Sequence, residues 1–434
     1  MMRMLAALAV LGAASSVSVP ARAQQPIEDF RVAGIHVIHK PIAANDVIAV
    51  RLYLNGGSAA LTPATAGIEQ LMVASSVLGT QKYDKEQFDA RSTATGTTID
   101  GEATREYTVY SLRAVRANWP AAWDLFAQAV AHPTFPKTEV DLARARQVND
   151  LKQRTDDPDS YLTLIGDSVT FSGHPFARDP QGTPESAAKL TSDDLTRWHR
   201  RRLTKANLLL VVVGNVSRAE LTSAVTSAFG GLAATGGEAP AVPALAQSKP
   251  SVTVMERDLP TNYIRGLYLA PSRSSADMPA LRLATRVLHD RLFEEVRTKR
   301  NMTYAVSSGV NTGVVSQGYL YVTAVDPDTT LKVMLTEVRR LQREPVPPAR
   351  LQETLNDFAT GYWLGQETNM NQAQQLGVWE LTGGGWRNSL TFVDRMRAVT
   401  PAQVQAVAKK YLRNARFVVV GNPKKIDRKL FASM

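Results

Sequence analysis

The chain of 434 residues contains no cysteine. Disulfide bonds, thiolate-ligated metals and cysteine nucleophiles are therefore excluded. It also lacks a Gly-x-Ser-x-Gly motif and a phosphate-binding loop. The sequence therefore gives no indication of a serine hydrolase of that type or of a nucleotide-binding enzyme. After the N-terminal segment, no stretch approaches the roughly 18 apolar residues that a membrane-spanning helix needs.

The N-terminal segment has the three parts of a secretion signal. Met1–Arg3 supplies a positive end, Leu5–Val17 is mostly small and apolar, and Ala21–Ala23 forms a small-x-small cleavage site before Gln24. The apolar part is too short to span a bilayer comfortably. We therefore expect a signal peptide over residues 1–23 and a soluble, exported mature chain, most simply in a bacterial periplasm.

Positive charge is in excess but spread along the chain. The formal charge of +10 falls to +8 when Arg3 and Arg22 leave with the signal peptide. The densest cluster, His199–Arg202, lies in a helical pattern and lacks the interleaved aromatic residues typical of nucleic-acid binding. We interpret this cluster as a solvated basic face and expect no nucleic-acid partner.

A sequence unit occurs twice. Leu190–Leu195 has a helix-start signal and leads into Leu208–Asn215, a β-branched run that ends at Gly-Asn. Val399–Val404 leads in the same way into Phe417–Asn422, with the same ending. The chain is therefore expected to contain two units of one topology.

Earlier in each half, a predicted strand leads into a predicted helix. The strands are Val47–Leu54 and Tyr263–Leu269, and the helical patterns are Ile68–Leu78 and Leu281–Val296. Strands mixed with long helices, without regular βαβ spacing, favour an α+β fold. We expect mainly antiparallel sheets with helices packed on one side.

A linker is expected between the two units. Residues 236–250 contain three prolines and two glycines among small residues, with no periodic apolar face. The predicted N-terminal domain is therefore 24–235 and the predicted C-terminal domain is 251–434, each of a usual domain size.

The segment Gly67–Thr80 resembles the zinc-binding helix of the pitrilysin/insulinase (M16) peptidases, Gly-Leu-Ala-His-Leu-Leu-Glu-His-Met-Leu-Phe-Lys-Gly-Thr. The coinciding residues are Gly67, Leu71, Gly79 and Thr80. The two family histidines fall on Gln70 and Ala74, and the glutamate falls on Val73. Two imidazoles one turn apart bind one zinc ion, and the carboxylate activates the metal-bound water. None of the three replacements can do either job, so we expect a degenerate site without metal or cofactor.

Further landmarks of the same family follow in order along the first half. They are Gly173–Phe176, Gly182–Glu185, Leu190–Leu195 and Val211–Gly214. The resemblance covers nearly the whole mature chain. It implies two tandem homologous α/β-roll domains of the LuxS/MPP-like metallohydrolase type.

In the second half, Arg291–Tyr304 resembles the family's Arg-Leu-Phe-x-x-Leu-Arg-x-Lys-x-Gly-Leu-x-Tyr segment. The resemblance implies that Arg297 and Tyr304 form a substrate-holding pair. Asn301 stands where the family breaks the helix at glycine, and asparagine also tolerates the left-handed conformation. An arginine can donate to peptide carbonyls, and a tyrosine hydroxyl can donate to a developing oxyanion. In the alternative interpretation, Arg297 is a surface cation and Tyr304 packs on the core, but the family match favours the substrate-holding role.

No replacement metal site is expected. The family's third ligand, a distal glutamate, falls within Val148–Gln153, where the register is open between Asp150 and its neighbours and no glutamate occurs. His36 and His39 are three apart in a predicted strand and so face opposite sides, and Glu69 cannot form a site alone. The remaining histidines are scattered singly at His132, His174, His199 and His289.

The resemblance implies a non-catalytic, substrate-holding subunit of a heterodimeric zinc peptidase that cleaves peptides or unfolded segments in an enclosed chamber. The partner would be a similar chain that carries His-x-x-Glu-His and the zinc ion, although a homodimer stays open. The alternative function is a binding or scaffold protein without a hydrolytic role, since the same fold serves structurally in a respiratory complex. A third hypothesis is an active hydrolase with an unrecognised site, which metal analysis would test.

Overall fold

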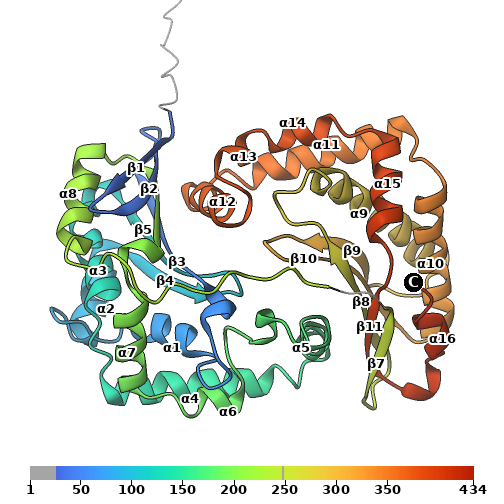
Figure 1. Cartoon of the computed structure of the whole chain (residues 1–434), viewed down its shortest axis with the longest axis horizontal. Coiled ribbons are helices and arrows are strands. Elements are labelled where there is room, and N and C mark those ends of the chain that lie inside the picture. Colours follow the sequence, from blue (N-terminus) through green and yellow to red (C-terminus); the bar gives the residue numbers. More distant parts are fainter. Residues whose placement is uncertain (1–25, 247–248) are drawn as a thin grey trace, which may run out of the picture.

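The computed structural model describes residues 26–246 and 249–434 (Figure 1). The expected signal peptide, 1–23, lies outside these residues. Within them, no helix is both long enough and apolar enough to cross a membrane.

The first half is built on a six-stranded mixed sheet with the order β1-β2-β6-β3-β5-β4. All neighbouring strands are antiparallel except β2 and β6. The strands are β1 Glu28–Val32, β2 Ile35–Pro41, β3 Val47–Asn55, β4 Thr98–Ala103, β5 Tyr107–Val115 and β6 Leu208–Gly214. Their bounds include the predicted strand Val47–Leu54.

The second half contains a five-stranded sheet with the order β7-β11-β8-β10-β9. Here β7 and β11 are parallel and the other pairs are antiparallel. The strands are β7 Ser251–Glu256, β8 Asn262–Ala270, β9 Val306–Asn311, β10 Ser316–Ala324 and β11 Arg416–Gly421. The order β2-β6-β3-β5-β4 of the first sheet is thus repeated strand for strand, as the internal repeat predicts.

Helices from each half cover one face of its own sheet, which agrees with the predicted α+β class. The helices of the first half are α1 Ile68–Ser75, α2 Lys85–Thr95, α3 Trp119–Ala131, α4 Lys137–Gln153, α5 Pro158–Thr170, α6 Pro184–Ala187, α7 Ser192–Arg202 and α8 Arg218–Phe229. Those of the second half are α9 Met278–Leu292, α10 Pro327–Arg343, α11 Pro348–Leu364, α12 Asn369–Thr382, α13 Arg387–Leu390, α14 Phe392–Arg397, α15 Pro401–Tyr411 and α16 Arg428–Phe431. Of these, α5 and α12 do not pack on the sheet of their own half. Alternate strand residues such as Val50 and Leu52 face these helices in the core of the first half.

The other face of each sheet is covered by a helix from the opposite half, which the sequence did not predict. Helix α12 packs on β3 and β6, and α5 packs on β8 and β11 (Figure 1). A helical glycine marks each close approach, because a Cβ on Gly377 would lie 2.2 Å from the Tyr53 ring and one on Gly166 would lie 2.9 Å from Leu267. The two halves are therefore joined by reciprocal packing as well as by the chain.

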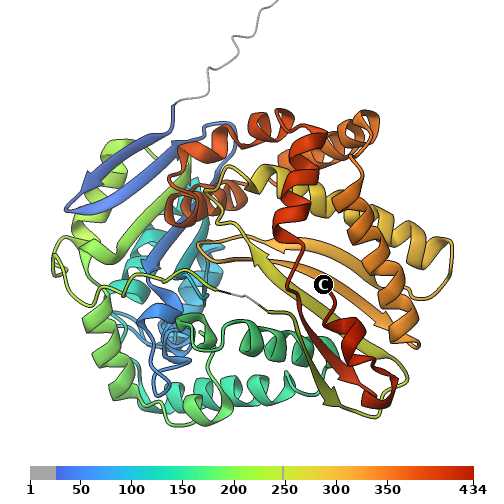
Figure 2. The ribbon, with the colours of Figure 1, turned by 45° about the vertical axis from the view of Figure 1, so that its right-hand side comes forward.

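The connection between α8 and β7 contains neither helix nor strand in its described residues, and it crosses from one half to the other (Figure 2). It is held against the first half at several points. Thr204 Oγ1 donates to the Gly236 carbonyl at 3.0 Å, and the His174 ring pairs with the Pro243 carbonyl at 3.0 Å. This connection therefore has a defined path over the first domain.

Candidate functional site

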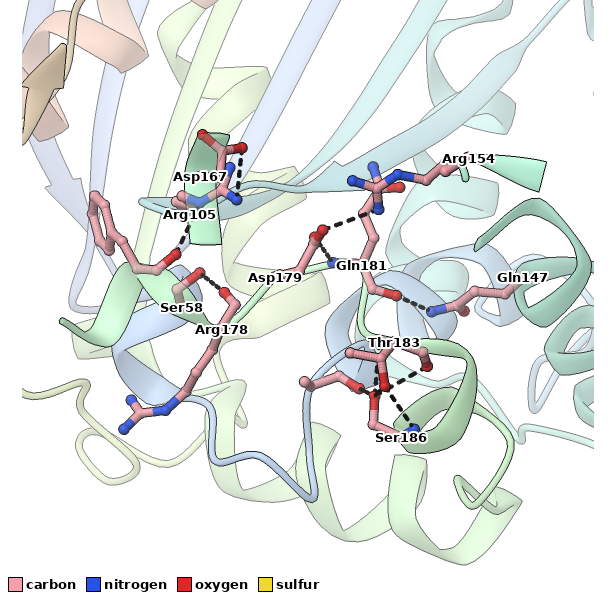
Figure 3. Close-up of polar contacts among 12 residues, drawn as sticks. Ser58, Arg105, Gln147, Arg154, Asp167, Arg178, Asp179, Gln181, Thr183 and Ser186 are labelled. Atoms are coloured by element: carbon pink, nitrogen blue, oxygen red, sulfur yellow. Dashed lines mark hydrogen bonds and ion pairs between the residues drawn. The ribbon is translucent and has the colours of Figure 1, made fainter. Parts of the chain in front are cut away.

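Helix α1 begins at a tight contact between two glycines of the family landmarks. Gly67 has φ 93°, and a Cβ there would lie 2.9 Å from the Gln181 carbonyl oxygen and 3.1 Å from the Gly182 Cα. Gln147 on α4 donates to the carbonyls of Gly67 and Gln181 at 3.1 and 2.8 Å, and its contact with Gln181 is drawn in Figure 3. A side chain at either glycine would push this contact apart, which explains why the start of α1 requires glycine.

Gln70, Val73 and Ala74 occupy the three positions of the zinc motif on α1. Gln70 bonds to a neighbouring strand, and the side chains of Val73 and Ala74 contain no polar atom. The Gln70 side-chain oxygen accepts from the Ala103 N–H of edge strand β4 at 3.1 Å. Val73 is buried, with a methyl group 2.6 Å from the position of a Cβ on Gly101, and Ala74 is exposed. These side chains do not fit a zinc ion, since they offer no imidazole and no carboxylate. Across the described ranges, no group of three or more His, Cys, Asp or Glu residues could hold a metal ion.

Asp150 faces the same space as these positions. A cavity of about 210 Å³ between α1 and α4 is lined by Gln70, Ala74 and Asp150, among others. The neighbouring Leu151 lines the same cavity, so the register of the third ligand stays open. Asp150 is the carboxylate on this wall, and it has no histidine to join.

Glu69 is an entirely buried carboxylate, with 0% exposure. It accepts from Thr108 at 2.6 Å and from the Trp198 indole at 3.2 Å, and it pairs with Arg202 at 3.4 Å. Burial raises the pKa of Glu69, while Arg202 and the two other donors oppose that rise. The group is structural and ties α1 to β5 and α7.

The solvated basic face predicted over His199–Arg202 is only half right. Arg200 and Arg201 are exposed, but Arg202 is 1% exposed. Besides Glu69, Arg202 donates to the carbonyls of Asn55 and Gly237. The periodicity of α7 turns Arg202 inward beside Trp198, where a buried carboxylate meets it.

Several histidines have a hydrogen-bond or ion-pair partner inside the chain. His36 pairs with Asp29 at 2.8 Å on β1, while His39, on the other face of β2, pairs with Glu28 at 3.3 Å. His199 bonds the Val130 carbonyl at 2.7 Å. Burial lowers the pKa of His39 and of His199, so both favour the neutral form.

Arg297 and Tyr304 are brought together. Helix α9 passes into a π-helical segment, Phe293–Thr298, and the chain then turns at Asn301, whose φ is 50° as the left-handed turn predicts. The Arg297 guanidinium carbon lies 5.6 Å from the centroid of the Tyr304 ring and 4.7 Å from that of Phe293. Tyr304 is 82% exposed, so the alternative interpretation that it packs on the core is wrong.

The pair and the α1 positions belong to different halves. The π-helical segment packs on α9, α10 and β9, whereas α1 packs on α4, α7 and β4. The catalytic role assigned to Arg297 and Tyr304 stays a prediction. In the structure, the exposed Tyr304 phenol lies beside the Arg297 guanidinium. Arg297 has no ion-pair partner among the described residues.

A larger cavity, of about 570 Å³, lies between the halves and is lined by charged pairs. Arg105 pairs with Asp167 at 3.1 Å and Arg154 with Asp179 at 3.0 Å, as Figure 3 shows. Burial raises the pKa of Asp167, against the effect of Arg105. The cavity adjoins the α1 cavity at Gln181, which lines both.

Two family models match the chain, and both describe the same family. Residues 37–176 match "Insulinase (Peptidase family M16)", and residues 189–358 match "Peptidase M16 inactive domain". The chain belongs to the M16 peptidase family. The resemblance seen around α1 and after α9 is thereby confirmed for the family, although not for the role of any residue.

The M16 relatives include proteins named as zinc proteases. An uncharacterized zinc protease of Mycobacterium tuberculosis is 25% identical over 430 residues, which is 95% of this chain and 96% of that protein. The bovine cytochrome b-c1 complex subunit 1 is 22% identical over 213 residues, 48% of this chain and 44% of that one. The family relatives thus include both zinc protease-like proteins and a subunit of a respiratory complex.

Solved structures show the same two-domain fold. The peptidase M16 inactive domain from Pseudomonas fluorescens superposes with a TM-score of 0.83 at 21% identity, covering 92% of this chain and 98% of that one. The periplasmic protease PqqL from Escherichia coli matches with a TM-score of 0.75 at 16% identity, covering 96% of this chain and 49% of that one. A chain of complex III from Candida albicans matches with a TM-score of 0.78 at 16% identity, covering 94% and 99%.

Sequence reasoning missed two arginines. Arg202 was assigned to the surface but is buried, and the half-buried Arg282 received no role although it lies between two buried leucines, Leu281 and Leu283. A cation that interrupts the apolar face of a helix is the signal that identifies such a residue. Its partner or ligand, however, comes from distant segments and cannot be read from the helix.

Proposed function

We propose that this chain is the non-catalytic, substrate-holding subunit of a heterodimeric M16 zinc peptidase. Its partner is a similar chain that carries His-x-x-Glu-His and the zinc ion. The two chains enclose peptides or unfolded segments, and this chain supplies Arg297 and Tyr304 to the partner's site. With the expected signal peptide, the complex works in the periplasm.

The observation that carries this proposal is that Tyr304 is exposed to solvent and that Arg297 lies directly beside it. Tyr304 is 82% exposed, and its ring lies beside a guanidinium. A phenol held in this way is free to donate to an oxyanion, and the guanidinium is free to donate to a peptide carbonyl. Tyr304 is largely exposed and Arg297 has no ion-pair partner among the described residues, so a role toward a molecule outside this chain accounts for both.

The residues at α1 support the non-catalytic half of the proposal. Gln70 is occupied by the backbone of β4, and Val73 is buried against β4 at Gly101. A catalytic carboxylate at position 73 would be forced into an apolar space. In the proposed complex, the metal site for hydrolysis comes from the partner chain.

The alternative is a binding or scaffold protein with no hydrolytic role. It is favoured by the similarity of about half the chain to a cytochrome b-c1 complex subunit. Under this alternative, the exposed Tyr304 would only contact a neighbouring subunit, and its hydroxyl would not affect any peptide cleavage.

The partner is tested by affinity capture of the tagged mature chain from its own host, with the captured proteins identified by mass spectrometry. The proposal expects a near-equimolar second chain that carries His-x-x-Glu-His. Recovery of this chain alone, as a monomer or a homodimer, would contradict the heterodimer and favour the scaffold alternative.

A further inference from the structure

A third cavity is lined by two arginines and by no acidic residue. It has a volume of about 340 Å³ and lies between α9, α12 and the end of α11. Arg273 and Arg282 line it together with Tyr362, Trp379 and several amide side chains. We call this cavity the basic pocket.

The two guanidinium groups of the basic pocket are only partly compensated by negative charge, because Glu106, which lines the larger cavity, attracts Arg273 alone. In the described part of the chain, neither Arg273 nor Arg282 has a carboxylate within ion-pair distance. Arg282 donates to the Thr312 hydroxyl at 3.4 Å, and Arg273 donates to the Thr312 carbonyl at 2.6 Å. The Arg273 Nε is buried and has no hydrogen-bond partner. Donor capacity is therefore left over in both groups.

Positive charge exceeds negative charge at this pocket, since Glu106 offsets Arg273 but is not among the groups that shift the pKa of Arg282. Burial lowers the pKa of Arg282 to about 10, and the neighbouring Arg273 adds to that effect, yet Arg282 stays charged at neutral pH. The Arg273 guanidinium carbon also lies 5.7 Å from the centroid of the Trp379 ring, whose face is a further wall of the pocket. An anion that enters this space relieves the mutual repulsion and gains charge-assisted hydrogen bonds.

The walls of the basic pocket fit a peptide rather than a bare ion. Gln374 and Gln375 line it from α12, and amide side chains can both donate to and accept from a peptide backbone. The Gln375 side-chain oxygen is buried without a partner, while its nitrogen donates to the Tyr362 hydroxyl. Arg273 and Val378 also line the larger cavity between the halves, so an extended chain has room to continue from one into the other.

We propose that the basic pocket binds the carboxylate of an aspartate or glutamate side chain within an extended peptide segment. Arg282 and Arg273 donate to the carboxylate, and the amides of Gln374 and Gln375 bind the adjoining backbone. The inference concerns this chain alone, so it stands or falls independently of a zinc-bearing partner.

The test measures the binding of fluorescein-labelled peptides to the purified full mature chain by fluorescence anisotropy. One peptide carries a central Glu-Glu pair among serine, threonine and glycine, and the other carries Gln-Gln in the same place. The acidic peptide is expected to bind at least about tenfold more tightly than the glutamine peptide. Equal affinities would overturn the proposal.

Single-residue variants test whether the preference for the acidic peptide comes from the basic pocket. Arg282→Gln and, separately, Arg273→Gln should each reduce the affinity for the acidic peptide about tenfold and leave that for the glutamine peptide unchanged. Arg286→Gln is the matched control, because Arg286 is exposed one turn further along α9 and pairs with Asp290. Two separate variants keep the test valid if one fails to fold, which circular dichroism shows. Retention of full affinity by a folded variant, or the same loss in Arg286→Gln, would overturn the proposal.

A free dicarboxylic acid offers the same chemical group without a peptide backbone. Glutarate should therefore displace the acidic peptide only at concentrations far above the dissociation constant of the peptide. Glutarate binding as tight as that of the peptide would overturn the assignment of a peptide ligand.

Discussion

The start of α1 and the segment after α9 carry the two family landmarks, and their side chains differ in exposure and in bonding to the rest of the chain. Around α1, the family backbone is kept, while Glu69, Gln70 and Val73 are buried or bonded to neighbouring strands. After α9, Tyr304 is exposed and lies beside Arg297. Side chains in the first region therefore stabilise the fold, and those in the second are available to another molecule. Changes in the first region should affect stability, and changes in the second should affect activity.

The largest effect is expected from Arg202→Met. This change leaves Glu69 buried without its charged partner, which costs about 3–5 kcal/mol of unfolding free energy. Denaturant titration of the purified chain measures it, and Arg201→Met on the exposed face of α7 is the matched control, with a change within about 0.5 kcal/mol. Equal effects of the two changes would show that the buried pair does not hold α1 in place.

The deficit of Arg202→Met should also depend on pH. A folded-state pKa of Glu69 above its ordinary value of 4.5 means that the folded state binds more protons, so stability is lost as pH rises through the raised pKa. Removal of Arg202 raises this pKa further. The variant should therefore be closest to the parent at a pH near or below 4.5 and furthest from it at neutral pH. A pH-independent deficit would contradict this account of Glu69.

The next effect is on activity. In the assembled peptidase, Tyr304→Phe and Arg297→Ala should each lower kcat/KM about 10²-fold, the usual cost of an oxyanion donor. Assembly and the melting temperature should stay unchanged, since Tyr304 is exposed. Arg300→Ala removes a nearby charge that pairs with Glu295 and serves as the control. If these variants cleave peptide as fast as the parent, Arg297 and Tyr304 do not have the proposed role in catalysis.

A smaller effect on stability is expected at Gly67. Gly67→Ala combines the strain of a positive φ with a clash against the backbone of Gln181 and should cost about 2–3 kcal/mol. Gly96→Ala is the control, because Gly96 also has a positive φ but nothing lies within 4 Å of its Cβ position. Its cost should be about 1 kcal/mol. Thermal unfolding distinguishes the two, and equal shifts would exclude the glycine contact as a reason for Gly67.

The smallest effects are expected at Asn301. Asn301→Gly keeps the left-handed turn at φ 50° and should change the unfolding free energy by no more than about 0.5 kcal/mol. Asn301→Val should cost about 1–2 kcal/mol and, by disturbing the turn that presents Tyr304, should also lower the activity of the complex. A valine variant with full stability and activity would show that the turn does not position the tyrosine.

The fold could be predicted well where a pattern is local. The β-branched runs became β6 and β11, and the asparagine turn after α9 was found as expected. The exchange of α5 and α12 between the halves could not be predicted, because an apolar helix face does not reveal which sheet it covers. The pairing of Glu69 with Arg202 was hidden for a similar reason, since the two residues are 133 positions apart.

The site was predictable only as far as the family motif reaches. The lost ligands Gln70, Val73 and Ala74 and the retained Arg297 and Tyr304 all came from aligned positions. Arg273 and Arg282 lie outside the motifs, and their significance comes from the cavity that they line together without an acidic residue, which only the folded chain shows.

The central claim is that the peptidase site is divided between two chains. It is tested most directly by measuring the hydrolysis of an internally quenched peptide by this chain, by the captured partner, and by their equimolar mixture, with zinc content determined for each. The account predicts no zinc and no hydrolysis for this chain, and hydrolysis by the mixture well above the sum of the separate rates. Stoichiometric zinc with chelator-sensitive cleavage by this chain alone, or a mixture no faster than that sum, would contradict it.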